Sequence, residues 1–131
     1  DQCVVTANGE VVGLVTEVGP NYSIIKTILD SSLGISATIA TSGYNGMVQG
    51  NYTEGRQDML RMNYLPSNAV IRNNDQVVTS GSTVYPRNLI LGYVVDAGFD
   101  DTGVAKFALL KPAADIETLE QVFILTSYNA G

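Results

Sequence analysis

Short β-branched runs that end in turn residues recur along this chain, and they restrict it to folds built from short strands. The segment 74–94 shows the pattern most clearly: a polar turn precedes the run Val77-Val78-Thr79, and Ser80-Gly81 ends that run. A second apolar run, at 89–95, contains Gly92. Turn residues on both sides of β-branched runs indicate strands. A glycine inside such a run indicates a bulge or a tight bend.

The same pattern extends over the rest of the chain. Asn8-Gly9 lies between two apolar runs and is a strong hairpin signal, because both residues tolerate positive φ. Residues 34–41 alternate apolar and polar side chains, as a half-buried strand does. The chain has about ten such runs, many glycine turns and no long amphipathic helix. We therefore predict an all-β protein, either a sandwich or a barrel.

Two parts of the chain contain similar short strings in the same order. Three early strings match three later ones: 1–6 with 75–79, 13–19 with 92–98, and 24–26 with 104–106. The repeat is longer than the roughly 20–50 residues of a solenoid unit, so it favours two related β subdomains. Chance similarity between short β-rich strings is the alternative.

The repeat predicts a division of the chain. Residues 1–33 would form a partial first β-barrel, with 116–131 as the segment that completes it, and 34–115 would form a second β-barrel. About forty residues with strands of their own precede Asp75, whereas none precede Asp1. If the copies are equivalent, the first subdomain lacks its opening strands and exposes a strand edge, which favours pairing between chains.

Composition narrows the classes of function. The chain has 131 residues, of which 45% are hydrophobic, so it can bury a core. Its net charge of −6 argues against binding to nucleic acid or to an anionic membrane surface, since both need basic patches. No apolar run approaches the ~20 residues of a membrane span, so we expect any membrane anchor upstream. Cys3 is the lone cysteine and cannot form an internal disulfide.

The residue types present in the chain permit few kinds of catalysis. The chain has no histidine, which excludes Ser-His and Cys-His catalysis in their usual form and zinc sites built on histidine. Asp100 and Asp101 lie in a Gly-flanked turn, where acidic residues are common for local reasons. We interpret them as a solvated turn rather than as a calcium or catalytic pair. The sequence therefore predicts no catalytic residue, no metal ligand and no cofactor site.

The tyrosines are the best candidates for contact with a partner. Tyr44, Tyr52 and Tyr85 fall in predicted loops, and Pro86 follows the last of them. Exposed aromatic rings in loops often bind partners, because they bury area at little entropic cost. The alternative is that each ring folds back over its own barrel. The residues alone indicate an acidic all-β module that binds other proteins.

The segment 75–94 also resembles the signature of a known family. Asp75-Gln76-Val77-Val78-Thr79-Ser80-Gly81, then Tyr85-Pro86, then 89–94 are similar to the signature of the bacterial rod shape-determining protein MreC family. Three further pieces agree in order: 9–15, Tyr64-Leu65-Pro66, and 111–115 with Leu119 and Val122. The resemblance covers nearly the whole chain.

Three positions depart from the family pattern. Asn74 and Asn88 stand where the family usually has glycine, and Ile90 replaces a frequent proline. Asparagine tolerates the same left-handed backbone as glycine. The departures therefore concern local turn geometry.

The resemblance implies a fold and a function. Members have one membrane helix, a coiled coil and an extracytoplasmic region of two small β-barrels, similar to those of chymotrypsin-like proteases but without catalytic residues. Such proteins scaffold the cell-wall elongation machinery at the extracytoplasmic face of the bacterial cytoplasmic membrane. They bind the class B penicillin-binding transpeptidase and MreD, act with MreB and RodA, and self-associate as dimers or filaments.

We therefore expect a non-enzymatic scaffold. A peptidoglycan- or carbohydrate-binding β module, suggested by the loop tyrosines, is one alternative. An inactive protease-like barrel is the other.

Overall fold

The computed structural model describes residues 2–53, 56–115 and 123–125, and for 51–53, 56–58 and 123–125 it describes the backbone path alone. This part of the chain forms ten strands and no helix. The strands are β1 (Gln2–Val5), β2 (Val11–Val18), β3 (Ser23–Thr27), β4 (Ile35–Ile39), β5 (Asn45–Thr53), β6 (Arg56–Leu65), β7 (Gln76–Thr79), β8 (Ile90–Phe99), β9 (Lys106–Pro112) and β10 (Phe123–Leu125). With no helix in the described ranges, none there is long and apolar enough to cross a membrane.

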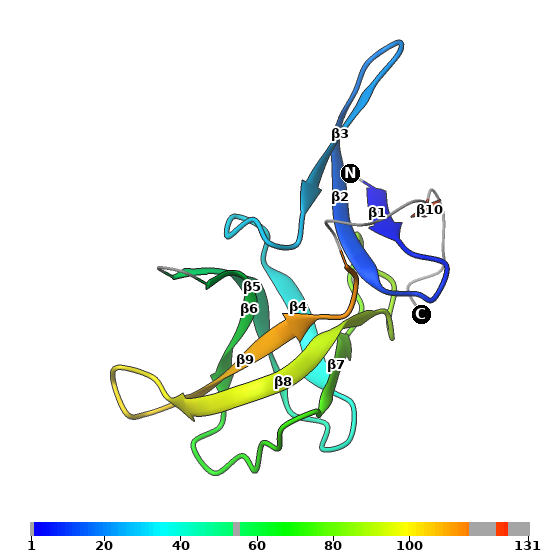
Figure 1. The fold of residues 1–131 in the computed structure, drawn as a ribbon. Coiled ribbons are helices and arrows are strands. Elements are labelled where there is room, and N and C mark those ends of the chain that lie inside the picture. The colour runs from blue at the N-terminus through cyan, green and yellow to red at the C-terminus, as the bar shows by residue number, and fades with distance from the viewer. Residues whose placement is uncertain (1, 54–55, 116–122, 126–131) are drawn as a thin grey trace.

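The strands form two sheets (Figure 1). The first is an open four-stranded sheet in the order β10-β1-β2-β3, and the second is a closed barrel in the order β4-β5-β6-β9-β8-β7. The all-β prediction is confirmed, and the main body is a barrel rather than a sandwich. A barrel removes free strand edges, because its first and last strands also pair.

The two sheets share one pattern of pairing. Val4 lies opposite Gly13 in the open sheet, and Val77 lies opposite Gly92 in the barrel. A register shift follows immediately in both, between Val4 and Val5 and between Val77 and Val78. The next pair of strands repeats the agreement, with shifts after Val15 and after Val94. The register therefore supports the relation between the two segments.

The register also corrects the alignment made from sequence. Lys26 lies opposite Leu14, whereas Lys111 lies opposite Tyr93, so Lys26 corresponds to Lys111 and not to Lys106. Within the match of 1–6 with 75–79, the register pairs Val77 with Val4. Sequence identity at a lysine was a weaker guide than strand pairing, because turn lengths differ between the copies.

The open sheet contains four of the six strand positions of the barrel. β10 pairs with β1 as β4 pairs with β7, antiparallel in both cases. In the barrel, β5 and β6 then join β4 to β9. The described part of the open sheet has no counterpart of these two strands, so its outer strands, β3 and β10, each have one neighbour there.

Each repeat has a glycine at the same place, Gly13 in the first and Gly92 in the second. A Cβ at Gly13 would fall on the carbonyl oxygen of Lys26, and a Cβ at Gly92 would fall on that of Lys111. Glycine in a strand often marks such a close approach of a neighbouring backbone. The expected irregularity near Gly92 is present as the two register shifts beside it.

The hairpin and turn signals are confirmed. Gly9 has φ +78 in the turn between β1 and β2, as Asn8-Gly9 predicts. Asn74 and Asn88 have φ of 71° and 68°, the left-handed conformation expected where they replace glycine. Tyr64 also has a positive φ, of 67°, and its sequence context did not indicate this.

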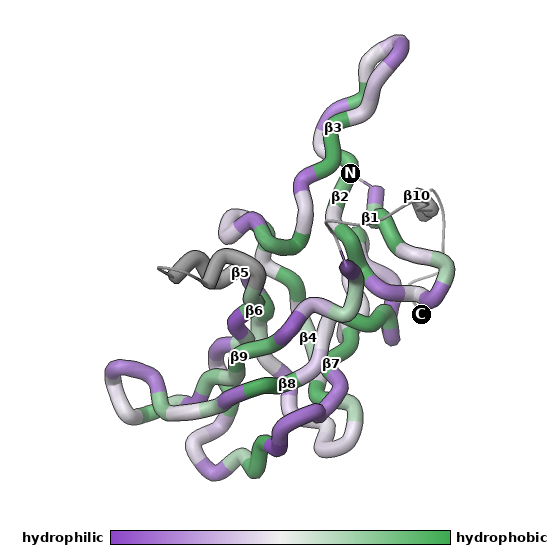
Figure 2. The backbone as a smooth tube through the Cα atoms, in the orientation of Figure 1, coloured by the Kyte–Doolittle hydropathy of each residue, from purple (hydrophilic) through white to green (hydrophobic). Residues whose placement is uncertain are grey.

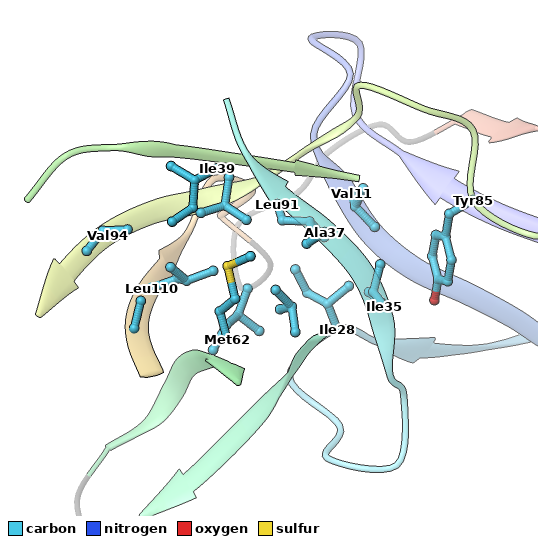
Figure 3. Packing of buried hydrophobic residues seen from close by; sticks show 14 of the residues in the cluster. Val11, Ile28, Ile35, Ala37, Ile39, Met62, Tyr85, Leu91, Val94 and Leu110 are labelled. Carbon is cyan, nitrogen blue, oxygen red and sulfur yellow. The ribbon is translucent and has the colours of Figure 1, made fainter. Parts of the chain in front are cut away.

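One apolar core joins the open sheet to the barrel. Figure 3 shows Val11 and Ile28 from the sheet region near Ala37 and Leu91 from the barrel. The loop after β1 also meets the start of β8, where Ile90 N–H donates to the Gly9 carbonyl at 2.9 Å. A smaller buried cluster of Val4, Val12, Val15 and Ala114 lies apart from it.

Candidate partner-binding surface

The carboxylates of the described residues do not gather into a group of metal ligands. No group of three or more potential metal ligands exists among them. The Asp100 carboxylate accepts hydrogen bonds from the Thr102 hydroxyl at 2.6 Å and from its N–H at 3.1 Å. These bonds, the hydroxyl first, lower the pKa of Asp100. Its geometry is that of a solvated turn, as its sequence context indicates.

Cys3 is a packing residue. Its side chain is buried in the core of the open sheet. Burial raises the pKa of the thiol from 9.0 to about 12, because the thiolate is poorly solvated there. A reactive cysteine needs the opposite shift and access to solvent.

Tyr85 is buried, which contradicts the exposure predicted for it. Its ring is 6% exposed and belongs to the core, in the loop between β7 and β8 (Figure 3). Burial first, and the charge of Cys3 second, raise the pKa of the phenol. Its hydroxyl has no hydrogen-bond partner among the described residues. This ring cannot meet a partner without leaving the core.

The other candidates from the sequence are also less exposed than expected, or are not described. Pro86 is half-buried, and its carbonyl accepts a hydrogen bond from the Thr79 hydroxyl that holds the loop closed. Tyr44 is half-buried and packs against the core. Tyr52 lies in β5 rather than in a loop, and its side chain is outside the described part. Partner binding by these residues stays a prediction, and so does the carbohydrate-binding alternative that the rings suggested.

Exposed apolar side chains gather in two other places. The hairpin patch comprises Val18, Tyr22, Ile24 and Ile25, on the β2–β3 hairpin that projects from the body in Figure 1. The barrel-end patch comprises Tyr64, Val70, Phe99 and Val104, at the C-terminal ends of β6 and β8 and in the loops that follow them. Figure 2 shows a hydrophobic stretch in the otherwise polar loop after β6.

Lys106 contacts the segments that carry the barrel-end patch. It lies opposite Phe99 on one side and opposite Leu65 on the other. Its ammonium group lies 5.2 Å from the centre of the Phe99 ring and donates a hydrogen bond to the Ala69 carbonyl at 2.8 Å. The residues next to Tyr64 and Val70 are thus fixed to the same lysine. Lys106 thus brings together the three segments that carry the patch residues.

A second cation lies over an aromatic ring on the outer face of the same strands. The Arg61 guanidinium stacks 3.9 Å from the centre of the Phe107 ring and donates to the Asn63 side chain at 2.7 Å. Gly98 lies opposite Phe107, and its missing side chain leaves room for the ring. Aromatic rings and arginine are enriched at the centres of protein interfaces.

Tyr64 combines the largest exposure in this patch with an unfavourable backbone. Its side chain is 78% exposed, and its φ of 67° lies in the left-handed region. This region costs a non-glycine residue on the order of 1–3 kcal/mol. It lies in the register shift between Met62 and Leu65, where a bulge can re-aim a side chain. Sequence reasoning placed Tyr64 only at the end of a strand, and no local signal distinguishes it.

The fold and surface define a class: an all-β barrel domain that presents aromatic and cationic side chains, in a chain without histidine. The family described as rod shape-determining protein MreC, barrel core, matches residues 1–126. The chain therefore belongs to the MreC family.

The relatives agree over nearly the whole chain. The cell shape-determining protein MreC of Geobacillus stearothermophilus is 27% identical over 134 residues, which cover 95% of this chain and 46% of that protein. This chain thus spans about half the length of that curated relative.

Two solved structures share the fold. MreC from Pseudomonas aeruginosa superposes with a TM-score of 0.84 at 22% identity, over 95% of this chain and 78% of that one. MreC from Helicobacter pylori, in a complex with penicillin-binding protein PBP2, has a TM-score of 0.74 at 21% identity, over 93% and 74%. At these identities the likeness concerns the fold.

Proposed function

We propose that this chain is the barrel core of a non-enzymatic scaffold that helps to set rod cell shape through the cell-wall elongation machinery. The match of the MreC barrel core to residues 1–126 carries the proposal. The absence of histidine from the sequence supports a role in binding rather than in catalysis. The scaffold acts on the extracytoplasmic face of the bacterial cytoplasmic membrane.

The first partner in this proposal is a class B penicillin-binding transpeptidase. The complex of PBP2 with the Helicobacter pylori protein, which shares this fold, supports that choice. MreD, MreB and RodA complete the proposed assembly, and for them the support is membership of the family.

The domain division stays part of the proposal. Residues 1–33 with 116–131 would be a partial first barrel, and 34–115 the second. The shared register of β1-β2-β3 and β7-β8-β9 supports it, as does the pairing of β10 with β1. The free edge of β3 in the described sheet offers main-chain groups for self-association, because exposed edges pair with added strands.

Binding to the transpeptidase of the same organism, produced without its membrane anchor, tests the proposed function. Isothermal titration calorimetry should show saturable binding with one site per chain. A transpeptidase from an unrelated class, at equal concentration, is the control. Heat indistinguishable from dilution for the cognate pair would reject the transpeptidase as the partner.

Light scattering tests self-association separately. The apparent mass of the chain should rise with concentration, and Ile24→Lys on the edge strand β3 should reduce that rise, because a charge opposes edge pairing. A constant monomer mass at all concentrations would contradict this part of the proposal.

A further inference from the structure

Two buried threonines close corresponding turns in the two repeats. Thr6 follows β1 and Thr79 ends β7, and both side chains are buried. The Glu10 N–H donates to the Thr6 hydroxyl at 3.3 Å, and the Leu89 N–H donates to the Thr79 hydroxyl at 2.9 Å. In each turn the threonine N–H also donates to the carbonyl of the same partner residue, at 2.9 Å and 2.8 Å. The two turns are therefore equivalent.

The second turn is much longer than the first. Three residues, 7–9, lie between the bonded residues of the first turn, whereas nine, 80–88, lie between those of the second. Because three residues suffice to connect the equivalent strands of the open sheet, the barrel does not need the additional ones to turn the chain. Long loops in compact domains often carry function. The additional residues therefore need a role of their own.

Hydrogen bonds close this loop on itself. The Thr79 hydroxyl donates to the Pro86 carbonyl at 2.5 Å, and the Tyr85 N–H donates to the Ser82 hydroxyl at 2.9 Å. The Asn88 N–H donates to the Thr79 carbonyl at 2.9 Å, with the asparagine in the left-handed conformation. The loop thus holds the backbone of Tyr85 in a fixed position.

Tyr85 enters the joint between the open sheet and the barrel. Its ring belongs to the same buried cluster as Cys3 of β1 and Val11 of β2, and Figure 3 shows the ring and Val11. In the same joint, the Ile90 N–H donates to the Gly9 carbonyl at 2.9 Å. The long loop of the barrel therefore meets the sheet through an aromatic ring, next to a main-chain bond.

The phenol hydroxyl weakens this contact. It is buried and has no hydrogen-bond partner among the described residues. Such a hydroxyl is desolvated without compensation, and it recovers hydrogen bonds to water when the ring leaves the core. A phenylalanine would fill the same space without this cost. The ring of Tyr85 is therefore held in the joint less tightly than its burial alone implies.

We propose that the loop 80–88 is a strap that holds the open sheet against the barrel and releases it when Tyr85 leaves the joint. Release exposes Cys3, while the six strands of the barrel stay paired. The connection between β3 and β4 stays packed on β5, because a Cβ at Gly50 would fall on the Leu29 carbonyl. The sheet therefore turns about this connection.

The original chain gives the first test, because the Cys3 thiol is buried while the strap is closed. N-ethylmaleimide labelling measures its exposure, and hydrogen exchange measures opening of β8 and β9 under the same conditions. Each rate is divided by that of the unfolded chain to give an opening constant. The constant for Cys3 should be larger by roughly tenfold or more, because the sheet opens locally. Equal constants would mean that sheet and barrel open together, and would overturn the proposal.

Variants of Tyr85 give the second test. Tyr85→Ala should speed Cys3 labelling by roughly tenfold or more and leave exchange in β8 and β9 nearly unchanged, because the lost ring contacts the joint. Tyr85→Phe should slow labelling by about twofold, since it keeps the ring and removes the unpaired hydroxyl. Tyr44→Ala is the matched control, because its half-buried ring packs against the same core from the turn between β4 and β5. It should leave Cys3 labelling within about twofold of the original.

Replacing 80–88 by the three residues of the first turn, 7–9, tests the whole strap. This variant should keep the amides of β8 and β9 protected and label Cys3 at least as fast as Tyr85→Ala does. Unchanged Cys3 labelling in both variants would reject the strap. Equal acceleration of Cys3 labelling and of exchange in β8 and β9 would reject it too, because Tyr85 would then be an ordinary core residue. A replacement that unfolds the barrel would assign the loop to the barrel itself and overturn the proposal.

Discussion

The open sheet and the closed barrel have the same strand order over four strands, yet they bury their side chains differently. Leu110 in β9 lies opposite Val94 and is 0% exposed. Ile25 in β3 lies opposite Val15 at the corresponding position and is 37% exposed. In the barrel, β9 also pairs with β6, whereas β3 has no second neighbour in the described sheet.

The contrast separates strand pairing from side-chain burial, two effects that usually occur together. Local sequence sets the pairing, because glycines and register shifts recur at corresponding places in both sheets. Closure sets the burial, because a residue becomes core only when strands from the far side of the barrel cover it. A strand can therefore have the correct register and still contribute little to stability.

The largest expected effect tests burial directly. Leu110→Ala should lower the free energy of unfolding by about 3 kcal/mol, because it removes buried methyl groups and leaves a cavity. Ile25→Ala at the corresponding position should lower it by less than about 1 kcal/mol, since this side chain keeps much of its contact with water. Urea unfolding measures both.

Equal losses for the two variants would contradict the comparison. If the loss at Ile25 grew with protein concentration, self-association through β3 would be covering it. Repeating the titration at two concentrations distinguishes these cases.

The two glycines test closure in a second way. Gly92→Ala would place a Cβ on the Lys111 carbonyl, and Gly13→Ala would place one on the Lys26 carbonyl. We expect a loss of about 2 kcal/mol at Gly92, because both neighbours of β9 hold it in place. Gly13→Ala should have about half that effect, since β3 has one neighbour in the described sheet and can move outward on its other side. Thermal unfolding of both variants measures the difference, and a larger loss at Gly13 would show that the edge of β3 is held.

Much of the fold follows from local chemistry. Turn residues at Asn8-Gly9, and the asparagines at 74 and 88, specify positive φ directly, so the sequence predicts these turns. The all-β class follows from the same short runs. The pairing of β4 with β7 and of β6 with β9 depends on barrel closure between distant segments, which local pattern does not encode.

The candidate site is predicted less well. Tyr85 reads as a loop aromatic, but the core formed between the sheet and the barrel encloses its ring. The barrel-end patch joins Tyr64, Phe99 and Lys106 from three segments, so only the folded chain reveals it. A hydrophobicity pattern cannot distinguish an aromatic residue that is exposed in the folded chain from one that is buried.

Alkaline pH tests the joint between the two regions, where Cys3 of the sheet lies near Tyr85 of the barrel loop. Burial raises the pKa of Cys3 from 9.0 to about 12, so the folded state keeps the proton. Stability from this group is complete below pH 9 and falls as pH rises, because only the unfolded chain releases the proton.

Between pH 9 and 10 the original chain should therefore lose roughly 1 kcal/mol more stability than Cys3→Ala. Urea unfolding at pH 8, 9 and 10 measures the slopes. All other groups are common to both proteins and cancel in the comparison. Parallel slopes would mean that the thiol ionises in the folded sheet, and that the joint admits water.

The smallest effect we predict has the opposite sign. Tyr85→Phe removes the buried hydroxyl, which has no hydrogen-bond partner among the described residues, and keeps the ring in the core. Because an unpaired buried hydroxyl is desolvated without compensation, the variant should gain about 0.5 kcal/mol. Tyr44→Phe, at a half-buried ring packed against the same core, is the control and should change little. A loss of stability in Tyr85→Phe would show that the hydroxyl is paired, and that the sheet and barrel are joined by a polar contact as well as by apolar packing.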